Sequence, residues 1–240
     1  MDCPMMYYRN LINYDMALDK VKTNFNLGKE IHRHLVSLGV ETPIVKGGGD
    51  EQERLNLVKN AVQTILSVGL NLDLSDDSLK ETPNRVAKMY LNEVFWGLNY
   101  AHFPKITTIC NKMQYNSMLL ERGIKVHSFC EHHLVPIVGE AYVAYIPNEK
   151  VIGLSKINRI VEFFSRRPQV QERLTEQIFH TLQYILETDN VAVLIKAEHF
   201  CVKLRGVEDI NSDTITSRLG GAFLNVPTVR GEFYNLVNGK

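Results

Sequence analysis

The 240-residue sequence predicts an α+β fold, in which a helical N-terminal region precedes an antiparallel sheet with helices on one face. Three observations support this prediction. Apolar residues recur at helical spacing in the first third of the chain, the pattern changes to a period of two from Ile124 to Tyr145, and a second period-two region begins at Val191 after two further helical stretches. Strands and helices that are segregated in this way favour an α+β sheet.

Composition excludes several classes of partner. The chain has 27 basic and 27 acidic residues, so bulk electrostatics do not favour nucleic acid or an anionic membrane. No apolar stretch approaches the ~20 residues that span a bilayer, and the N-terminus carries no signal-peptide pattern. The cysteines are Cys3, Cys110, Cys130 and Cys201. Their uneven spacing and the missing signal predict a reducing, cytoplasmic setting.

The N-terminal third reads as helices separated by a linker. We expect a helix from about Asp15 to Leu38, ended by Gly39, and irregular structure over residues 41–49. A second helix follows from about Glu51 to Val68, and its apolar stripe requires a partner surface. We therefore divide the chain into an N-terminal helical extension and linker (1–49), a helical part (50–103) and a catalytic domain (104–240).

A third helix is expected from Thr82 to about Gly97, with Thr82 as its N-cap and Pro83 at the first helical position. Arg85 and Lys88 are three residues apart and so share one face of this helix. Taken alone, such a pair indicates a solvated basic face rather than a binding site.

Two strands follow, from Ile124 to Cys130 and from Ile137 to Tyr145. The alternation places Ile124, Val126, Ser128 and Cys130 on one face. These strands can pair through the turn at 131–136, which would place Cys130 and His133 at a sheet end. Because His127 lies on the opposite face, we interpret it as structural.

The next two segments are amphipathic helices. The first opens at Ser155 and ends before Arg166-Arg167-Pro168, with Lys156 and Arg159 together on one face. The second runs from about Val170 to Leu186. Gln171 and Glu172 lie in its first turn, where the helix dipole favours a carboxylate for purely structural reasons.

The C-terminal part predicts a strand from Val191 to Leu204, a last strand at 214–217 and a closing helix at 228–237. Alternation along the first of these places His199 and Cys201 on the same face.

A metal site is predicted from the cysteine and histidine spacing. Cys130-x-x-His133 can close on one ion from a turn, and Cys201 makes a plausible third ligand. Three protein ligands leave a fourth position for water, the arrangement of a catalytic zinc. His132 and His199 are then placed for proton transfer, although His132 can also be interpreted as support for a metal ligand.

Basic side chains on separate elements suggest an anionic substrate: Arg85, Lys88, Lys156, Arg159 and Arg205. No phosphate loop is present in the sequence, because Gly47-Gly48-Gly49 leads into Asp50-Glu51. Arginine forks and lysines would have to hold the anion. The residues by themselves predict a zinc hydrolase and leave its substrate open.

Five ordered segments together resemble the zinc-dependent GTP cyclohydrolase I family. They are 81–89 (ETPNRVAKM), 130–133 (CEHH), 151–159 (VIGLSKINR), 167–175 (RPQVQERLT) and 199–206 (HFCVKLRG). The resemblance runs from about Leu70 to Asn235 and is loose before Gly49. It implies the tunnelling fold, a four-stranded antiparallel sheet with two helices between its second and third strands. It also implies a toroidal homodecamer with active sites between subunits.

The resemblance further implies hydrolysis of GTP at guanine C8 with release of formate, then rearrangement to 7,8-dihydroneopterin triphosphate, the first step of pterin and folate biosynthesis. The implied metal ligands are Cys130, His133 and Cys201, with His132 and His199 transferring protons and Ser155 assisting ribose opening. Glu172 and Gln171 would contact the base. The triphosphate would lie against Arg85, Lys88, Lys156, Arg159 and Arg205.

Two alternative functions compete with this one. An NADPH-dependent nitrile reductase of the same fold uses a cysteine nucleophile without zinc, and the combination of Cys130, His133 and Cys201 argues against it. A non-catalytic, zinc-stabilised pterin-binding module would have no use for both His132 and His199 beside the metal.

Overall fold

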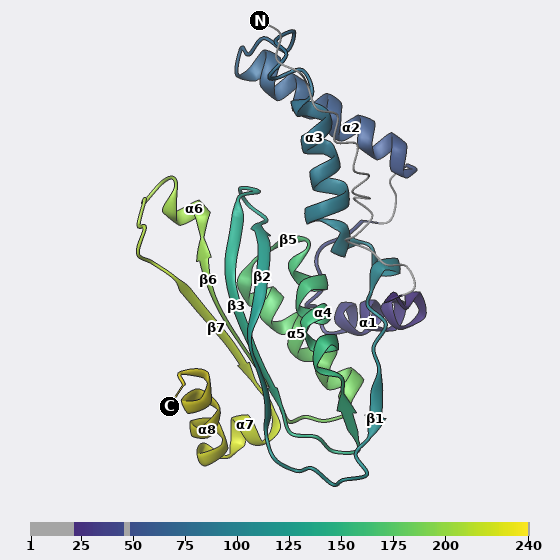
Figure 1. Cartoon of the computed structure of the whole chain (residues 1–240), viewed down its shortest axis with the longest axis vertical. Coiled ribbons are helices and arrows are strands. Elements are labelled where there is room, and N and C mark those ends of the chain that lie inside the picture. The colour runs from purple at the N-terminus through teal and green to yellow at the C-terminus, as the bar shows by residue number, and fades with distance from the viewer. Residues whose placement is uncertain (1–21, 46–48, 240) are drawn as a thin grey trace, which may run out of the picture.

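A computed structural model describes residues 22–45 and 49–239. Its central feature is a five-stranded sheet with the order β5-β2-β3-β6-β7 (Figure 1). The four long strands are antiparallel neighbours: β2 (Leu119–Cys130), β3 (Pro136–Tyr145), β6 (Val191–His199) and β7 (Thr214–Leu219). Helices α4 (Leu154–Ser165) and α5 (Gln171–Leu186) lie between β3 and β6 in sequence, which confirms the predicted topology.

Short strands extend this framework beyond the prediction. β5 (Pro168–Gln169) pairs in parallel with the end of β2, and β1 (Thr108–Cys110) pairs antiparallel with β4 (Lys150–Ile152). Two-residue and three-residue strands have too little alternation to be recognised in a sequence. β5 places Gln169 opposite Cys130 at the end of β2.

The predicted faces of β2 are confirmed. Ile124, Val126, Ser128 and Cys130 are buried, whereas Lys125 and His127 are exposed. The buried face packs against α4, while α5 packs against β6 and β7, and Ile160 and Ile178 of these helices join one large core cluster. Burial of this face fixes the register of β2, since a slip by one residue would turn the whole apolar set to solvent.

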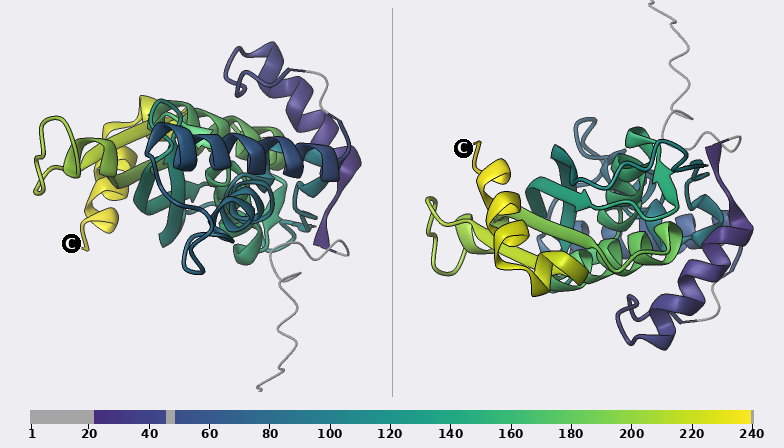
Figure 2. Two further views of the ribbon diagram at one scale, coloured as in Figure 1. Left: turned by 90° about the horizontal axis from the view of Figure 1, so that it is seen from above. Right: turned by 90° about the horizontal axis from the view of Figure 1, so that it is seen from below.

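Helices cover part of the second face of the sheet as well, contrary to the expectation of helices on one face. α7 (Gly221–Asn225) and α8 (Pro227–Val237) pack there through Phe223 and Phe233. Residues 191–195 of β6 are consequently buried on both faces. Figure 2 shows α8 on the side of the molecule opposite α1 (Phe25–Ser37).

The first helix is shorter in the described part of the chain than predicted. It begins at Phe25 because the Asn24 side chain caps it by accepting from Leu27 N, while the Asn24 backbone is extended. The part of the prediction at 15–21 lies outside the described residues. The predicted stop is confirmed by Gly39, which has a left-handed φ of 71°.

The segment after α1 is irregular, as expected, but part of it is buried. Glu41 forms an ion pair with Arg167, whose side chain is 0% exposed. Arg167 also donates to Thr42 Oγ1 and to the carbonyl of Gly97. A buried guanidinium without such partners would be costly, so this segment is anchored beside β5. Whether residues 1–49 form a separate unit remains a prediction.

The predicted helices at 51–68 and 82–97 are present with altered ends. α2 (Glu51–Thr64) continues as a π-helical segment, Ile65–Gly69. α3 (Thr82–Lys88) continues as a π-helical segment, Met89–Val94, and then a 3₁₀ turn, Trp96–Leu98. The cap prediction was wrong: Glu81 precedes the helix with a helical backbone, so Thr82 already lies in the first turn. In Figure 1, α2 and α3 project away from the sheet.

Candidate metal centre and active site

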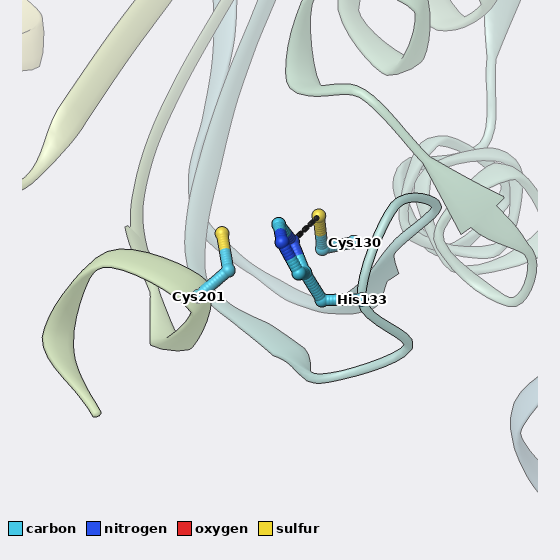
Figure 3. Close-up of side chains that lie close together, drawn as sticks. All are labelled: Cys130, His133 and Cys201. Atoms are coloured by element: carbon cyan, nitrogen blue, oxygen red, sulfur yellow. Dashed lines mark hydrogen bonds between the residues drawn. The ribbon is translucent and has the colours of Figure 1, made fainter. Parts of the chain in front are cut away.

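Three predicted ligands converge at one end of the sheet. Cys130 is the last residue of β2, His133 lies in the following turn and Cys201 lies in the short helix α6 (Phe200–Lys203). One ligand atom of each lies within 4.8 Å of the others, and Cys130 Sγ is 3.7 Å from His133 Nδ1. Figure 3 shows the three side chains directed toward one another.

The turn that carries His133 is fixed by backbone hydrogen bonds. Cys130 N donates to Val135 O over 2.8 Å, and Leu134 N donates to Cys130 O over 2.8 Å. Leu134 has a left-handed φ of 51°, a conformation that non-glycine residues rarely adopt. Glu131 N donates to Gln169 O, which joins the turn to β5. The backbone is therefore arranged before any ligand binds.

Cys201 reaches the site by a route that differs from the prediction. The strand expected to run to Leu204 ends at His199, and the chain then enters α6, where Leu204 N donates to Phe200 O. His199 and Cys201 therefore do not share a strand face. A one-turn helix offers no periodicity to detect, so the sequence pattern of a strand appeared to continue.

The three side chains fit a zinc ion. Tetrahedral zinc with Zn–S of ~2.3 Å and Zn–N of ~2.0 Å separates neighbouring ligand atoms by about 3.5 Å. The 3.7 Å between Cys130 Sγ and His133 Nδ1 matches this spacing, and the upper limit of 4.8 Å for the trio requires only a small contraction. Two thiolates and one imidazole form a donor set that favours zinc over magnesium or calcium.

The electrostatics of the trio favour a cation. Burial raises the pKa of the Cys201 thiol, and the neighbouring Cys130 raises it further. Two adjacent thiolates repel each other, whereas a metal ligand must be deprotonated. A divalent cation between them would offset this repulsion.

Of the predicted proton-transfer histidines, His132 contacts Cys130, and His199 ends β6 directly before the helix that carries Cys201. His132 is exposed, and its Nδ1 is 3.8 Å from Cys130 Sγ. His199 is partly buried and bonds through Nε2 to Gln171 Oε1 at 2.7 Å. Burial lowers the pKa of His199, and the carboxylate of Glu172 partly offsets that shift. A neutral imidazole near physiological pH can accept a proton.

An ion pair that the sequence did not reveal supports the same turn. Arg173 on α5 binds Glu131 through both oxygens of the carboxylate. The two residues are 42 positions apart, and no spacing rule connects them. The contact joins the turn of His133 to the first turns of α5, the helix that carries Gln171 and Glu172.

The predicted substrate contacts fall into two groups. Gln171, Glu172 and Arg205 lie at the metal end of the sheet, with Arg205 Nη1 2.7 Å from His133 Nε2. Gln171 is 2% exposed and Glu172 is exposed. The positions of Glu172 and Arg205 are compatible with contacts to the base and to a phosphate, and the predicted contacts of all three residues remain predictions.

The second group lies elsewhere on the chain. Ser155, Lys156 and Arg159 occupy the N-terminal half of α4, whose C-terminal end leads into β5 beside Cys130. At a rise of ~1.5 Å per residue, the distance along the helix from Ser155 to Ser165 is about 15 Å. Arg85 and Lys88 are exposed on α3. Among the described residues, none of these five side chains has a hydrogen bond or ion pair with the trio.

Comparisons with known proteins identify the family. The model of the family GTP cyclohydrolase I matches residues 58–238. GTP cyclohydrolase 1 of Actinobacillus pleuropneumoniae serotype 5b is 53% identical over 210 residues, covering 88% of this chain and 96% of the relative. GTP cyclohydrolase 1 of Aeromonas hydrophila is 57% identical over 195 residues, covering 81% and 89%. The relative from Photobacterium profundum is 55% identical over 197 residues, covering 82% and 90%.

A solved structure of the archaeosine synthase QueF-Like in the apo form shares 19% identity, with a TM-score of 0.36, and covers 45% of this chain and 94% of its own. A likeness of this size decides nothing about function. The family match spans the sheet, α4, α5 and all three metal-ligand candidates, and curated relatives cover nearly their full length at more than half identity. On that evidence the chain belongs to the GTP cyclohydrolase I family.

Proposed function

We propose that this protein hydrolyses GTP at C8 of guanine, releases formate and converts the product to 7,8-dihydroneopterin triphosphate, the first step of pterin and folate biosynthesis. The observation that carries the proposal is the convergence of Cys130, His133 and Cys201 with two further histidines beside them. The named relatives support the same activity. We also propose a cytoplasmic location, because thiols that bind a metal must remain reduced.

Zinc would be held by Cys130, His133 and Cys201. When bound, it would activate water as a nucleophile near neutral pH. His199, with its lowered pKa, would accept a proton, and the exposed His132 would exchange protons with solvent and the departing formate. Ser155 would assist opening of the ribose ring.

Glu172 would select guanine. Its carboxylate can accept from both N1–H and the exocyclic amine of guanine, whereas adenine offers no such donor pair. A site discriminates strongly against a base that leaves one of its polar groups without a hydrogen-bond partner. The position of Glu172 beside His199 supports a base that lies against the proton-transfer residues.

Arg205 would contact the triphosphate after the metal binds. In this structure His133 Nε2 accepts from Arg205, while Nδ1 faces Cys130. An imidazole that coordinates through Nδ1 carries its proton on Nε2 and can no longer accept from a guanidinium. Arg205 would then be free to bind phosphate.

The remaining contacts would come from other copies of the chain. No described hydrogen bond or ion pair joins the trio to any of five residues of its own chain: Ser155, Lys156, Arg159, Arg85 and Lys88. β2 upstream of Phe129 and β7 are the open edges of the described sheet. Pairing β2 of one copy with β7 of the next is a head-to-tail contact, and repeated contacts of this kind form a ring when the rotation between copies closes. We propose the toroidal homodecamer that the family resemblance implies, and these open edges support a ring.

A direct test measures formate release from GTP and from ATP together with zinc content by elemental analysis. We expect formate from GTP alone and about one zinc per chain. Full activity in zinc-free protein would contradict the proposed chemistry, and equal turnover of ATP would contradict the role of Glu172.

A further inference from the structure

The side-chain amide of Gln171 is held in one orientation by three acceptors. Its Nε2 lies 3.1 Å from Ile195 O, 2.9 Å from Thr214 O and 3.1 Å from Thr216 Oγ1. Two of these are backbone carbonyls, which can only accept. The NH₂ group must therefore face β6 and β7, and Oε1 must point the other way.

This orientation determines the tautomer of His199. Gln171 Oε1 lies 2.7 Å from His199 Nε2, and an amide oxygen can only accept. Nε2 therefore carries the hydrogen. In the neutral ring, Nδ1 is then the nitrogen with the free lone pair.

A hydroxyl pair joins this amide to the backbone of α5. Thr216 Oγ1, which accepts from the amide, lies 2.7 Å from Thr175 Oγ1, and Thr175 Oγ1 donates to the backbone carbonyl of Gln171 over 2.9 Å. Thr175 and Gln171 are both 2% exposed. Residues of α5, β6 and β7 thus hold the amide together, and a rotation of Gln171 would break several buried hydrogen bonds at once.

We propose that Gln171 is a positioning residue for His199: it fixes the imidazole as the Nε2–H tautomer and so leaves Nδ1 as the nitrogen that accepts a proton. This inference rests on the proposed function, in which His199 transfers protons. It differs from the base contact that the family resemblance implies for Gln171. The amide has no free donor to offer a base, because its NH₂ group already faces three protein acceptors.

Gln171→Met tests this role, because methionine keeps the length of the side chain and removes the acceptor. We expect kcat to fall about 10- to 100-fold, as is typical when a supporting partner of an active-site histidine is lost. Zinc content and affinity for a non-hydrolysable GTP analogue should stay within about 2-fold of wild type, well below that loss in kcat. A large loss of analogue affinity with kcat retained would show a base contact instead.

Gln177→Met is the matched control. Gln177 is also on α5 and 0% exposed, but its amide bonds to Gln169, Glu41 and Thr42, which lie outside the proposed catalytic group. We expect it to lower the melting temperature and to leave kcat within about 2-fold of wild type. If Gln171→Met and Gln177→Met lowered kcat equally, general destabilisation of the fold would explain the effect of Gln171→Met.

A double-mutant cycle with His199→Ala provides the decisive comparison, measured as formate release with enzyme in excess. If Gln171 acts through His199, Gln171→Met costs nothing further in the His199→Ala background. The same fold-loss in both backgrounds would overturn the proposal. Thr216→Val, a milder change to the same network, should lower kcat in the same pattern if Gln171→Met does not fold. Wild-type protein that releases no formate would instead refute the proposed function.

Discussion

Cys130 and Cys201 reach the same point by different means. Cys130 is placed by the alternation of β2, in which every second residue is buried, whereas Cys201 is placed by a helical turn after β6. Alternation is a property of neighbouring residues and was predicted correctly. The turn depends on how β6 ends against β3, where His199 pairs with Ile137.

At this residue scale we expect His132→Ala and His199→Ala to retain zinc and GTP-analogue binding but to lose turnover by roughly 10²- to 10⁴-fold. Neither residue belongs to the trio whose ligand atoms lie within 4.8 Å. Elemental analysis measures the retained zinc, equilibrium binding measures the affinity for the GTP analogue, and formate release measures turnover. Loss of metal from either variant would mean that the ligands are wrongly assigned.

At the scale of elements, α5 joins the active site to the N-terminal helix. Its first turn carries Gln171 and Glu172, and its middle carries His180, which packs near His34 of α1 with ring centroids 6.5 Å apart. His180 Nε2 lies 3.1 Å from Glu176 Oε2, and Arg218 of β7 contacts the same carboxylate. Tyr184 of α5 also packs against His34, with ring centroids 4.9 Å apart.

This packing predicts a pH dependence of stability. Burial lowers the pKa of His180, Glu176 partly offsets that shift, and Arg218 and His34 lower the pKa further. The unfolded chain, with a histidine pKa of ~6.5, therefore binds more protons than the folded chain as the pH falls toward and below that value. Neutral His180 therefore contributes to the free energy of unfolding above pH ~6.5, and this contribution is lost as the pH falls below that value.

His180→Gln should flatten this dependence, because glutamine does not titrate. The midpoint of urea unfolding, measured for both proteins at pH 8 and pH 5.5, reports this dependence. The midpoint of the wild type should fall more between the two pH values than that of His180→Gln. An equal fall in the midpoints of the two proteins would show that His180 is not the group responsible for the pH dependence. Arg218→Gln serves as a control, since it retains His180 and so should retain most of the slope.

On the scale of the whole molecule, the proposed site is divided between the ends of the chain's sheet. The metal trio lies at one end, whereas Ser155 lies in the first turn of α4, about 15 Å along that helix from Ser165, and Lys156 and Arg159 follow it. Exposed apolar residues on α2 and the segment after it include Leu57, Ile65 and Val68. Such side chains are typical of a surface that another protein chain covers.

Mixed oligomers test this division. Co-assembly of Arg159→Ala with His199→Ala chains should restore about a quarter of wild-type activity, because random mixing pairs two intact halves at about one interface in four. Co-assembly of His132→Ala with His199→Ala should restore none, since both residues belong to the same half. No recovery in the first mixture would place the whole site within one chain.

No helix in the described ranges, 22–45 and 49–239, is long and apolar enough to cross a membrane. The order strand, strand, helix, helix, strand, strand and the buried face of β2 followed from the sequence because periodicity is a local property that burial enforces directly. The Cys-x-x-His spacing is likewise local, because a single turn is enough to bring its two side chains together. The identity of two ligands was therefore readable before the fold was known.

Only the tertiary structure decided which distant groups meet. It brought Cys201 to Cys130, Arg173 to Glu131 and Gln171 to His199, pairs separated by 71, 42 and 28 positions. It also placed Arg167 and Glu41, 126 positions apart, in one buried ion pair. Periodicity carries no information about such pairs, because the packing of α5 against the sheet sets their separation. The sequence by itself thus determined the elements and the chemistry of the ligands, while the packing of the elements decided which side chains act together.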